Sequence, residues 1–325
     1  MTEVTIDTGA LAGTNITAKN GTAIQFFGGI PYAAPPVGDL RWRAPQPAEA
    51  WEGVRDATGF GASCPQLVVT EGGFREAISN ALGTPAPEQV ELTYDEDCLY
   101  LNVFTPTTAS DAKLPVLFWV HGGAHRFGTS TNMPGEELAS RGVVLVSINY
   151  RLGPLGFMSH PELTAEGCRG NQGLLDTVSA LQWVNRNITT FGGDPANVTV
   201  FGESAGGHST CAMFTSPLTK GLMHRAIAQS GVGAHATQLL DRAGAVPMSA
   251  HDTGEMLGEV LGCEKGAGQL AAMRDVSTDD IINKTATFPM PGVIIDGYCQ
   301  PKNPLTIIRE GEHNNVPLMI GSNAF

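Results

Sequence analysis

The sequence is poor in basic residues. Its 325 residues include 19 Lys and Arg against 32 Asp and Glu, which gives a formal net charge of -13. Proteins that bind nucleic acid need clustered Lys and Arg to neutralise phosphates, so this composition argues against a nucleic-acid partner. The excess of acidic groups is expected to serve solubility.

Long apolar runs and a secretory leader are also missing. No stretch reaches the roughly 20 apolar residues that span a bilayer, so we expect no membrane segment. Residues 1–13 (MTEVTIDTGALAG) have neither a basic start nor an apolar run, which argues against a signal peptide. The expected location is the cytoplasm.

Cysteine is scarce, with six in the chain, which does not make a disulfide scaffold. A chain of this length can bury roughly three quarters of its unfolded surface, so a large core needs no covalent support. The 40 Gly and 21 Pro indicate many turns. Because no repeat or low-complexity tract divides the chain, we expect one domain over residues 1–325, incomplete at its C-terminus for the reason given below.

The order of apolar segments predicts an α/β fold. Three short β-rich segments before residue 30 predict antiparallel strands at a sheet edge, and the polar stretch 63–95 predicts a long loop. From residue 99 onward, buried-strand patterns alternate with helical ones, which indicates a mostly parallel sheet with helices on both faces. The clearest helix has one apolar face, formed by Leu174, Val178, Leu181, Val184 and Ile188. The strand candidates are 99–106, 115–123, 142–150, 197–204, 225–231 and 316–323.

The segment Gly202-Glu203-Ser204-Ala205-Gly206 has the G-x-S-x-G pattern of a nucleophile elbow. An apolar strand precedes it and a helical pattern follows, so Ser204 is expected on a sharp turn at the carboxyl edge of the sheet, where such folds place their chemistry. A serine that merely caps the helix is the alternative. The complete strand, elbow and helix favour a nucleophile.

The segment His121-Gly122-Gly123-Ala124 ends another predicted strand at the same edge. Attack on an ester turns the carbonyl oxygen into an anion, and backbone N–H groups exposed by glycines can stabilise it. Together with the N–H of Ala205, this loop predicts an oxyanion hole.

These segments resemble the type-B carboxylesterase family, which includes cholinesterases and bacterial p-nitrobenzyl esterases. The similar segments run in family order: 26–47, 96–106, 170–176, 191–207 and 226–231. The resemblance implies an α/β-hydrolase fold with antiparallel N-terminal strands, an acyl-serine mechanism without a cofactor, and a small-molecule ester substrate.

The resemblance also implies roles for individual residues. Ser204 matches the nucleophile, and Gly123, Ala124 and Ala205 match the oxyanion donors. A disulfide between Cys64 and Cys98 and an ion pair between Arg41 and Glu96 are likewise implied. His125 and Arg126 depart from the family, which usually has an aromatic residue after the oxyanion loop. This departure predicts a cation near the pocket mouth, either selecting acidic acyl groups or facing solvent.

No residue in the chain can be assigned as the acid or the histidine that activates Ser204. In the family both follow the strand that resembles 316–323, so we expect them beyond Phe325. Asp296 or Glu310 with His313 satisfies the chain order, but His313 precedes its strand and so lies at the wrong edge. His224 also precedes a strand and is rejected for the same reason. His121 in the oxyanion loop and His208 on the helix after Ser204 do not match the family's base position.

The chain alone is therefore expected to be inactive or weakly active, and to associate through apolar surface that a C-terminal part would cover. Two other functions stay open. One is a non-catalytic, cholinesterase-like binding protein, which the presence of Ser204 disfavours. The other is an amidase or carbamate hydrolase that uses the same site.

Overall fold

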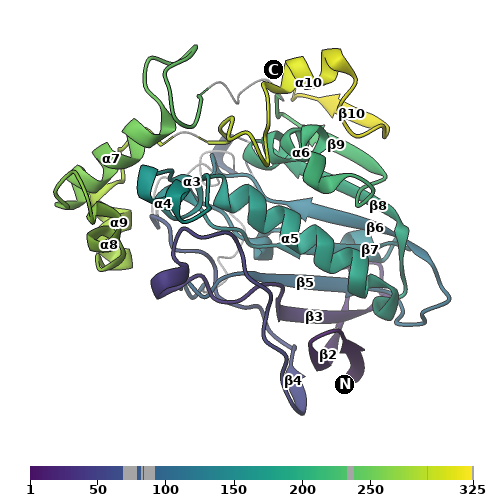
Figure 1. Cartoon of the computed structure of the whole chain (residues 1–325). Helices are drawn as coiled ribbons and strands as arrows, with labels where there is room; N and C mark the ends of the chain where they lie inside the picture. Colours follow the sequence, from purple (N-terminus) through teal and green to yellow (C-terminus); the bar gives the residue numbers. More distant parts are fainter. Residues whose placement is uncertain (69–78, 82, 84–91, 233–237, 291, 324–325) are drawn as a thin grey trace.

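A ten-stranded sheet runs through the molecule (Figure 1). This computed structural model describes residues 1–68, 79–81, 83, 92–232, 238–290 and 292–323. The strand order is β1-β2-β3-β5-β7-β6-β8-β9-β10, with β4 paired to β2. The strands are β1 (Thr2–Ile6), β2 (Gly9–Thr17), β3 (Ala23–Pro31), β4 (Val54–Asp56), β5 (Tyr100–Thr105), β6 (Leu114–Val120), β7 (Val144–Ile148), β8 (Gly193–Glu203), β9 (Arg225–Gln229) and β10 (Leu318–Gly321).

The expected sheet is confirmed. Strands β7, β6, β8, β9 and β10 pair in parallel, whereas β1, β2, β3 and β5 pair with antiparallel neighbours. Each strand candidate of the sequence is a strand in the structure, but the short β4 was not foreseen. Much of the predicted loop 63–95 lies outside the described residues.

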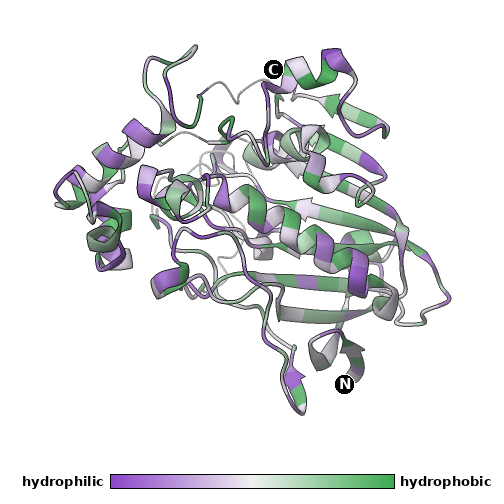
Figure 2. Cartoon of the chain, in the orientation of Figure 1, coloured by the Kyte–Doolittle hydropathy of each residue, from purple (hydrophilic) through white to green (hydrophobic). Residues whose placement is uncertain are grey.

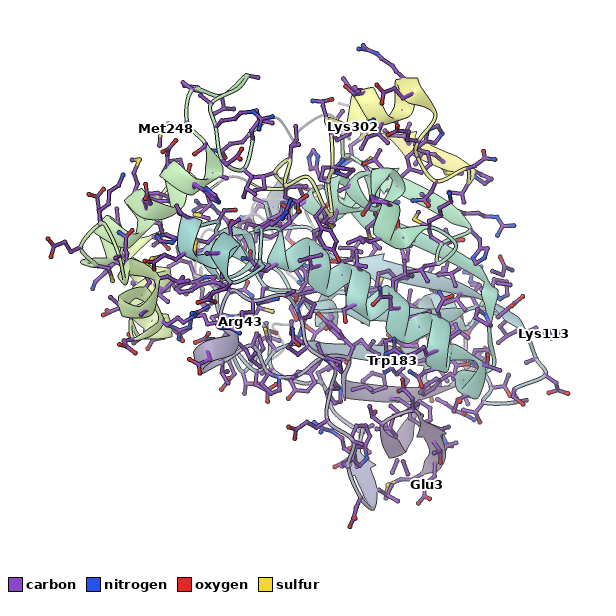
Figure 3. All side chains as sticks on the ribbon, viewed as in Figure 1. Glu3, Arg43, Lys113, Trp183, Met248 and Lys302 are labelled. Carbon is purple, nitrogen blue, oxygen red and sulfur yellow. The ribbon has the colours of Figure 1, made fainter. Side chains whose placement is uncertain are left out.

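Helices α5 and α6 pack against the parallel strands, in front of the sheet in Figure 1. All five residues of the predicted apolar helical face are buried. The α-helix ends one residue before Ile188, which begins a 3-10 turn. Trp183 on the same helix, labelled in Figure 3, is only 1% exposed. The helices are α2 (Gly135–Ala139), α3 (Gly153–Phe157), α4 (Pro161–Ala165), α5 (Gln172–Asn187), α6 (Ala205–Thr215), α7 (Ala250–Leu261), α8 (Gln269–Arg274), α9 (Thr278–Lys284) and α10 (Pro304–Glu310).

Helices α7, α8 and α9 form a group beside α3 and α4, at the left of Figure 1. The group has its own apolar cluster, which includes Leu257, Leu270 and Ile281 and extends to Leu155 and Leu163. Arg41 ties this group to the segment before β5. It donates to Glu96 at 2.5 and 2.8 Å and to the carbonyls of the segment before α9, so the implied ion pair is present and structural.

Strand β10 lies at the sheet edge with all four residues exposed, although it is largely apolar (green in Figure 2). Met319 is 66% and Ile320 57% exposed. Among the strands that the structure describes, β10 pairs with β9 alone. Among the described residues, no helix is both long and apolar enough to cross a membrane.

Candidate active site

Ser204 stands on a sharp turn between β8 and α6. Its backbone has φ 54° and ψ -120°, a conformation that residues other than glycine rarely adopt. The Ser204 N–H donates to the carbonyl of Gln229 at the end of β9, at 2.8 Å. Ser204 is half-buried and lies at the carboxyl end of β8. The predicted succession of strand, sharp turn and helix is therefore present.

The glycines on either side of Ser204 allow this turn because the backbones touch there. A Cβ on Gly206 would overlap the carbonyl oxygen of Val120, at the end of β6. A Cβ on Gly202 would lie 2.7 Å from the same oxygen and would overlap Gly206. The N-terminus of α6 thus lies directly against the end of β6, where the oxyanion loop begins.

The loop of residues 121–128, which is predicted to carry oxyanion donors and is called the oxyanion loop for that reason, comes close to Ser204. A Cβ on Gly122 would lie 3.3 Å from Cβ of Ser204 and 2.7 Å from the Glu203 carbonyl oxygen. Gly123 has φ 111°, and a Cβ there would overlap the carbonyl of Phe127. That same turn lets the Gly123 carbonyl accept from Arg126 and Phe127, at 2.9 and 3.0 Å.

Three backbone N–H groups, those of Gly123, Ala124 and Ala205, are the predicted oxyanion donors. Within the described chain, the loop N–H groups of Gly123 and Ala124 have no backbone acceptor. Ala205 is the first residue of α6, so its N–H is one of the four that a helix leaves without an intrahelical partner. The helix N-terminus also favours negative charge. The arrangement can stabilise an oxyanion.

Each described histidine contacts a partner other than Ser204. His121 Nδ1 donates to the Gly122 carbonyl at 2.8 Å, and its ring stacks on Tyr150. His208 Nδ1 lies 2.8 Å from the Val232 carbonyl oxygen. The remaining partners are Ser209 for His125, Gln269 for His160, Val198 for His224, Thr164 for His251 and Phe214 for His313.

Burial keeps the two histidines of the loop neutral. It lowers the pKa of His121 to about 4, against the opposing effect of the Gly122 carbonyl. It lowers the pKa of His125 to about 3, with further lowering from electrostatic interaction with the His208 and His121 rings and an opposing effect from the Ala205 carbonyl. Neither imidazole carries charge near neutral pH.

The other acids and histidines weighed from sequence serve the scaffold. Asp296 is buried and accepts from Asn171 Nδ2 at 2.9 Å and from the N–H groups of Tyr298 and Gln300. Glu310 accepts from Lys302 on the surface at 2.6 Å. His313 stacks on Phe214 at the far end of α6 from Ser204, which agrees with its rejection as a base.

The structure corrects the expectation for His125 and gives Arg126 backbone partners. The sequence predicted a cation that either selects acidic acyl groups or faces solvent. His125 is instead buried, with Nε2 2.9 Å from Ser209 Oγ, and Arg126 donates to the carbonyls of Ala286 and Phe288. Both side chains contact residues that are distant in the sequence, so no local sequence pattern predicts these contacts.

Cys64 and Cys98 are buried thiols whose side chains interact. The pKa of Cys98 is raised mainly by burial and further by its hydrogen bond with Cys64. The disulfide between them stays a prediction. In the described part of the chain, no group of three or more His, Cys, Asp or Glu side chains is arranged to hold a metal ion.

Known proteins resemble the whole chain. The sequence profile of the Carboxylesterase family matches residues 1–325. The medium-chain fatty acyl-CoA hydrolase precursor of Anas platyrhynchos is 41% identical over 309 residues, covering 93% of this chain and 52% of the relative. Para-nitrobenzyl esterase of Bacillus subtilis (strain 168) is 40% identical over 321 residues, covering 94% and 60%. A solved structure of PNB esterase matches with a TM-score of 0.80 at 37% identity, over 99% of this chain and 63% of that one. The chain thus spans little more than half the length of these curated relatives.

Proposed function

The chain belongs to the carboxylesterase family, and we propose that it carries the acyl-transfer centre of a serine carboxylic-ester hydrolase with Ser204 as nucleophile. The observation that carries the proposal is the approach of two loops. Gly122 lies so close to Ser204 that a Cβ on it would be 3.3 Å from the Ser204 Cβ. This closeness supports a site in which the nucleophile and the oxyanion donors act on one reacting carbonyl.

In the proposed reaction, Ser204 Oγ attacks the ester carbonyl carbon while a base takes its proton. The N–H groups of Gly123, Ala124 and Ala205 hold the oxyanion until the alcohol leaves with a proton. Water then attacks the acyl-serine and releases the carboxylic acid. The substrate is an uncharged small-molecule ester, and the relative para-nitrobenzyl esterase is named for the hydrolysis of an ester.

We further propose that full turnover needs a histidine and an acid contributed by polypeptide outside residues 1–325. Two observations support this. Each described histidine contacts a partner other than Ser204, and the chain matches little more than half of its relatives' length. The exposed strand β10 offers such polypeptide an apolar surface. Without the base and acid, about 10³–10⁴-fold catalysis over the uncatalysed reaction is expected.

The test measures hydrolysis of p-nitrophenyl butyrate by the 325-residue chain, with and without excess imidazole as a base in solution. Ser204→Ala is the matched control, because imidazole itself cleaves activated esters. We expect slow hydrolysis that depends on Ser204 and rises with imidazole. If the chain and Ser204→Ala hydrolyse the ester equally, Ser204 is not the nucleophile. Rapid Ser204-dependent turnover without imidazole would contradict the need for an outside base.

A matched pair of butyrate substrates separates ester from amide hydrolysis. We expect p-nitrophenyl butyrate to react and the corresponding p-nitroanilide to stay intact. Preferred cleavage of the anilide would favour the amidase alternative.

A further inference from the structure

We propose that His125 is a positioning residue, which ties the oxyanion loop to the nucleophile helix α6 through a hydrogen bond with Ser209. The inference deepens the proposed function and rests on it. The His125 imidazole bonds to Ser209 Oγ and also interacts with the carbonyl of Ala205, and no N–H that is predicted to hold the oxyanion belongs to His125. It would act by setting where the loop N–H groups stand relative to Ser204.

The hydrogen bond joins the two halves of the oxyanion hole. His125 follows the loop donors Gly123 and Ala124 directly, and Ser209 lies one helical turn after the third donor, Ala205. The distance from Nε2 to Oγ is 2.9 Å, and the residues are 8% and 1% exposed. In such a buried place, water does not compete for the bond.

The loop needs such a restraint because its backbone is strained. Gly123, Ala124 and His125 have φ values of 111°, 54° and 55°, so two successive residues with a Cβ lie in the left-handed region. Conformations of this kind persist only where the surroundings hold them. Neither β6 nor α6 includes these three residues, so side chains and loop contacts must supply the restraint.

Contacts around His125 fix its place. Its carbonyl accepts from the N–H of Gly153 at 2.6 Å, and its ring packs on Phe157 with 4.7 Å between centroids. On another side, a Cβ on Gly292 would lie 3.1 Å from Nδ1. The imidazole therefore fills a closed space, in which Ser209 is its side-chain hydrogen-bond partner.

Arg126 holds the loop from a second direction. Its guanidinium donates to the Ala286 carbonyl at 2.9 Å and to the Phe288 carbonyl, in the segment after α9. The loop is thus held between the nucleophile helix and the α7–α9 group. The two attachments are independent, so loss of the His125 bond should loosen the loop without unfolding it.

The experiment compares four variants of the 325-residue chain: His125→Phe, Ser209→Ala, the double variant His125→Phe/Ser209→Ala, and His125→Gln. The first two each break the bond and leave one buried polar group without its partner. The double variant replaces both partners by apolar groups, which can restore stability without restoring the bond. In His125→Gln, the amide can reach Ser209 from the position of Nε2.

Two quantities are measured beside the thermal midpoint. One is the rate of covalent labelling of Ser204 by a fluorophosphonate, whose phosphoryl oxygen takes the place of the ester oxyanion. The other is amide hydrogen exchange in a peptide covering residues 121–128. We expect both single variants to label roughly 10-fold to 100-fold more slowly and to exchange about tenfold faster in this peptide. His125→Gln should stay close to the parent chain.

The double variant distinguishes positioning from mere stabilisation. We expect its thermal midpoint to recover while labelling stays slow. Recovery of both together would overturn the proposal, as would unchanged exchange at 121–128 in both single variants. If the parent chain does not label even when excess imidazole supplies the base, the proposed nucleophile fails. Hydrogen exchange then still decides whether His125 restrains the loop.

Discussion

Arg151 and Asp176 form a buried ion pair that joins the segment after β7 to helix α5. Arg151 Nε and Nη2 donate to the two carboxylate oxygens at 2.8 and 2.6 Å, and the side chains are 3% and 0% exposed. Gly153, two residues beyond Arg151, donates to the His125 carbonyl. The pair therefore supports the segment on which the oxyanion loop rests.

Asp176→Asn should destabilise the fold strongly. The change leaves the buried Arg151 cation without a counter-charge, which typically costs about 3–5 kcal/mol. Urea unfolding followed by circular dichroism measures the loss. The matched control is Asp7→Asn, which breaks the exposed Arg186–Asp7 pair and should cost less than about 1 kcal/mol. Equal losses would show that burial does not decide the strength of these pairs.

Ser204→Gly should make the protein more stable than Ser204→Ala. Both variants lack the nucleophile, but only glycine adopts the φ 54° and ψ -120° of this turn without strain. Relief of strain at one such residue is worth about 1–3 kcal/mol, partly offset by the flexibility of glycine in the unfolded chain. Thermal unfolding of the two variants, side by side, measures the difference. If the alanine variant is as stable, the turn stores no strain.

Stability should fall as the pH decreases from 6.5 to 5. His121 and His125 have folded pKa values of about 4 and 3, below the ordinary 6.5. The unfolded chain therefore binds protons in this range while the folded chain does not. Each histidine lowers the free energy of unfolding by about 1.4 kcal/mol for each pH unit below 6.5. Above pH 6.5 this effect is absent.

Urea unfolding at pH 7.5, 6.5 and 5 tests this pH dependence. His251, whose pKa is lowered chiefly by burial, acts in the same direction. The lowered pKa values of Glu166 and Asp252 matter only below about pH 4.5, because their ordinary values lie there. His125→Phe should reduce the slope between pH 6.5 and 5. An unchanged slope would mean that His125 is protonated in the fold.

Oxidation should close a disulfide between Cys64 and Cys98. The buried thiols interact directly, and the loop they would close has about 34 residues, which predicts roughly 3–4 kcal/mol of added stability. Unfolding in urea after treatment with oxidised glutathione, with and without dithiothreitol, measures the gain. Cys98→Ser should show no response to either reagent. A parent chain that also shows none would contradict the pairing.

Much of the site could be predicted from the sequence because its parts are local. The elbow around Ser204 and the loop at Gly123 each consist of contiguous residues, and the glycines in them indicate where the backbone must turn sharply or approach another segment. The strand patterns on either side placed both at one sheet edge, and the structure agrees. The short strand β4 was missed because three residues are too few for a pattern.

The sequence by itself therefore determined the sheet, the sharp turn at Ser204 and the glycine-rich loop at residues 121–124, since each rests on periodicity or on a short run of residue types. Only the tertiary structure decided what holds them together. His125 meets Ser209 across 84 positions of the chain, and Arg126 meets Ala286 across 160. Such contacts depend on how separate elements pack against each other. The residues around each partner contain no pattern that would predict the other partner.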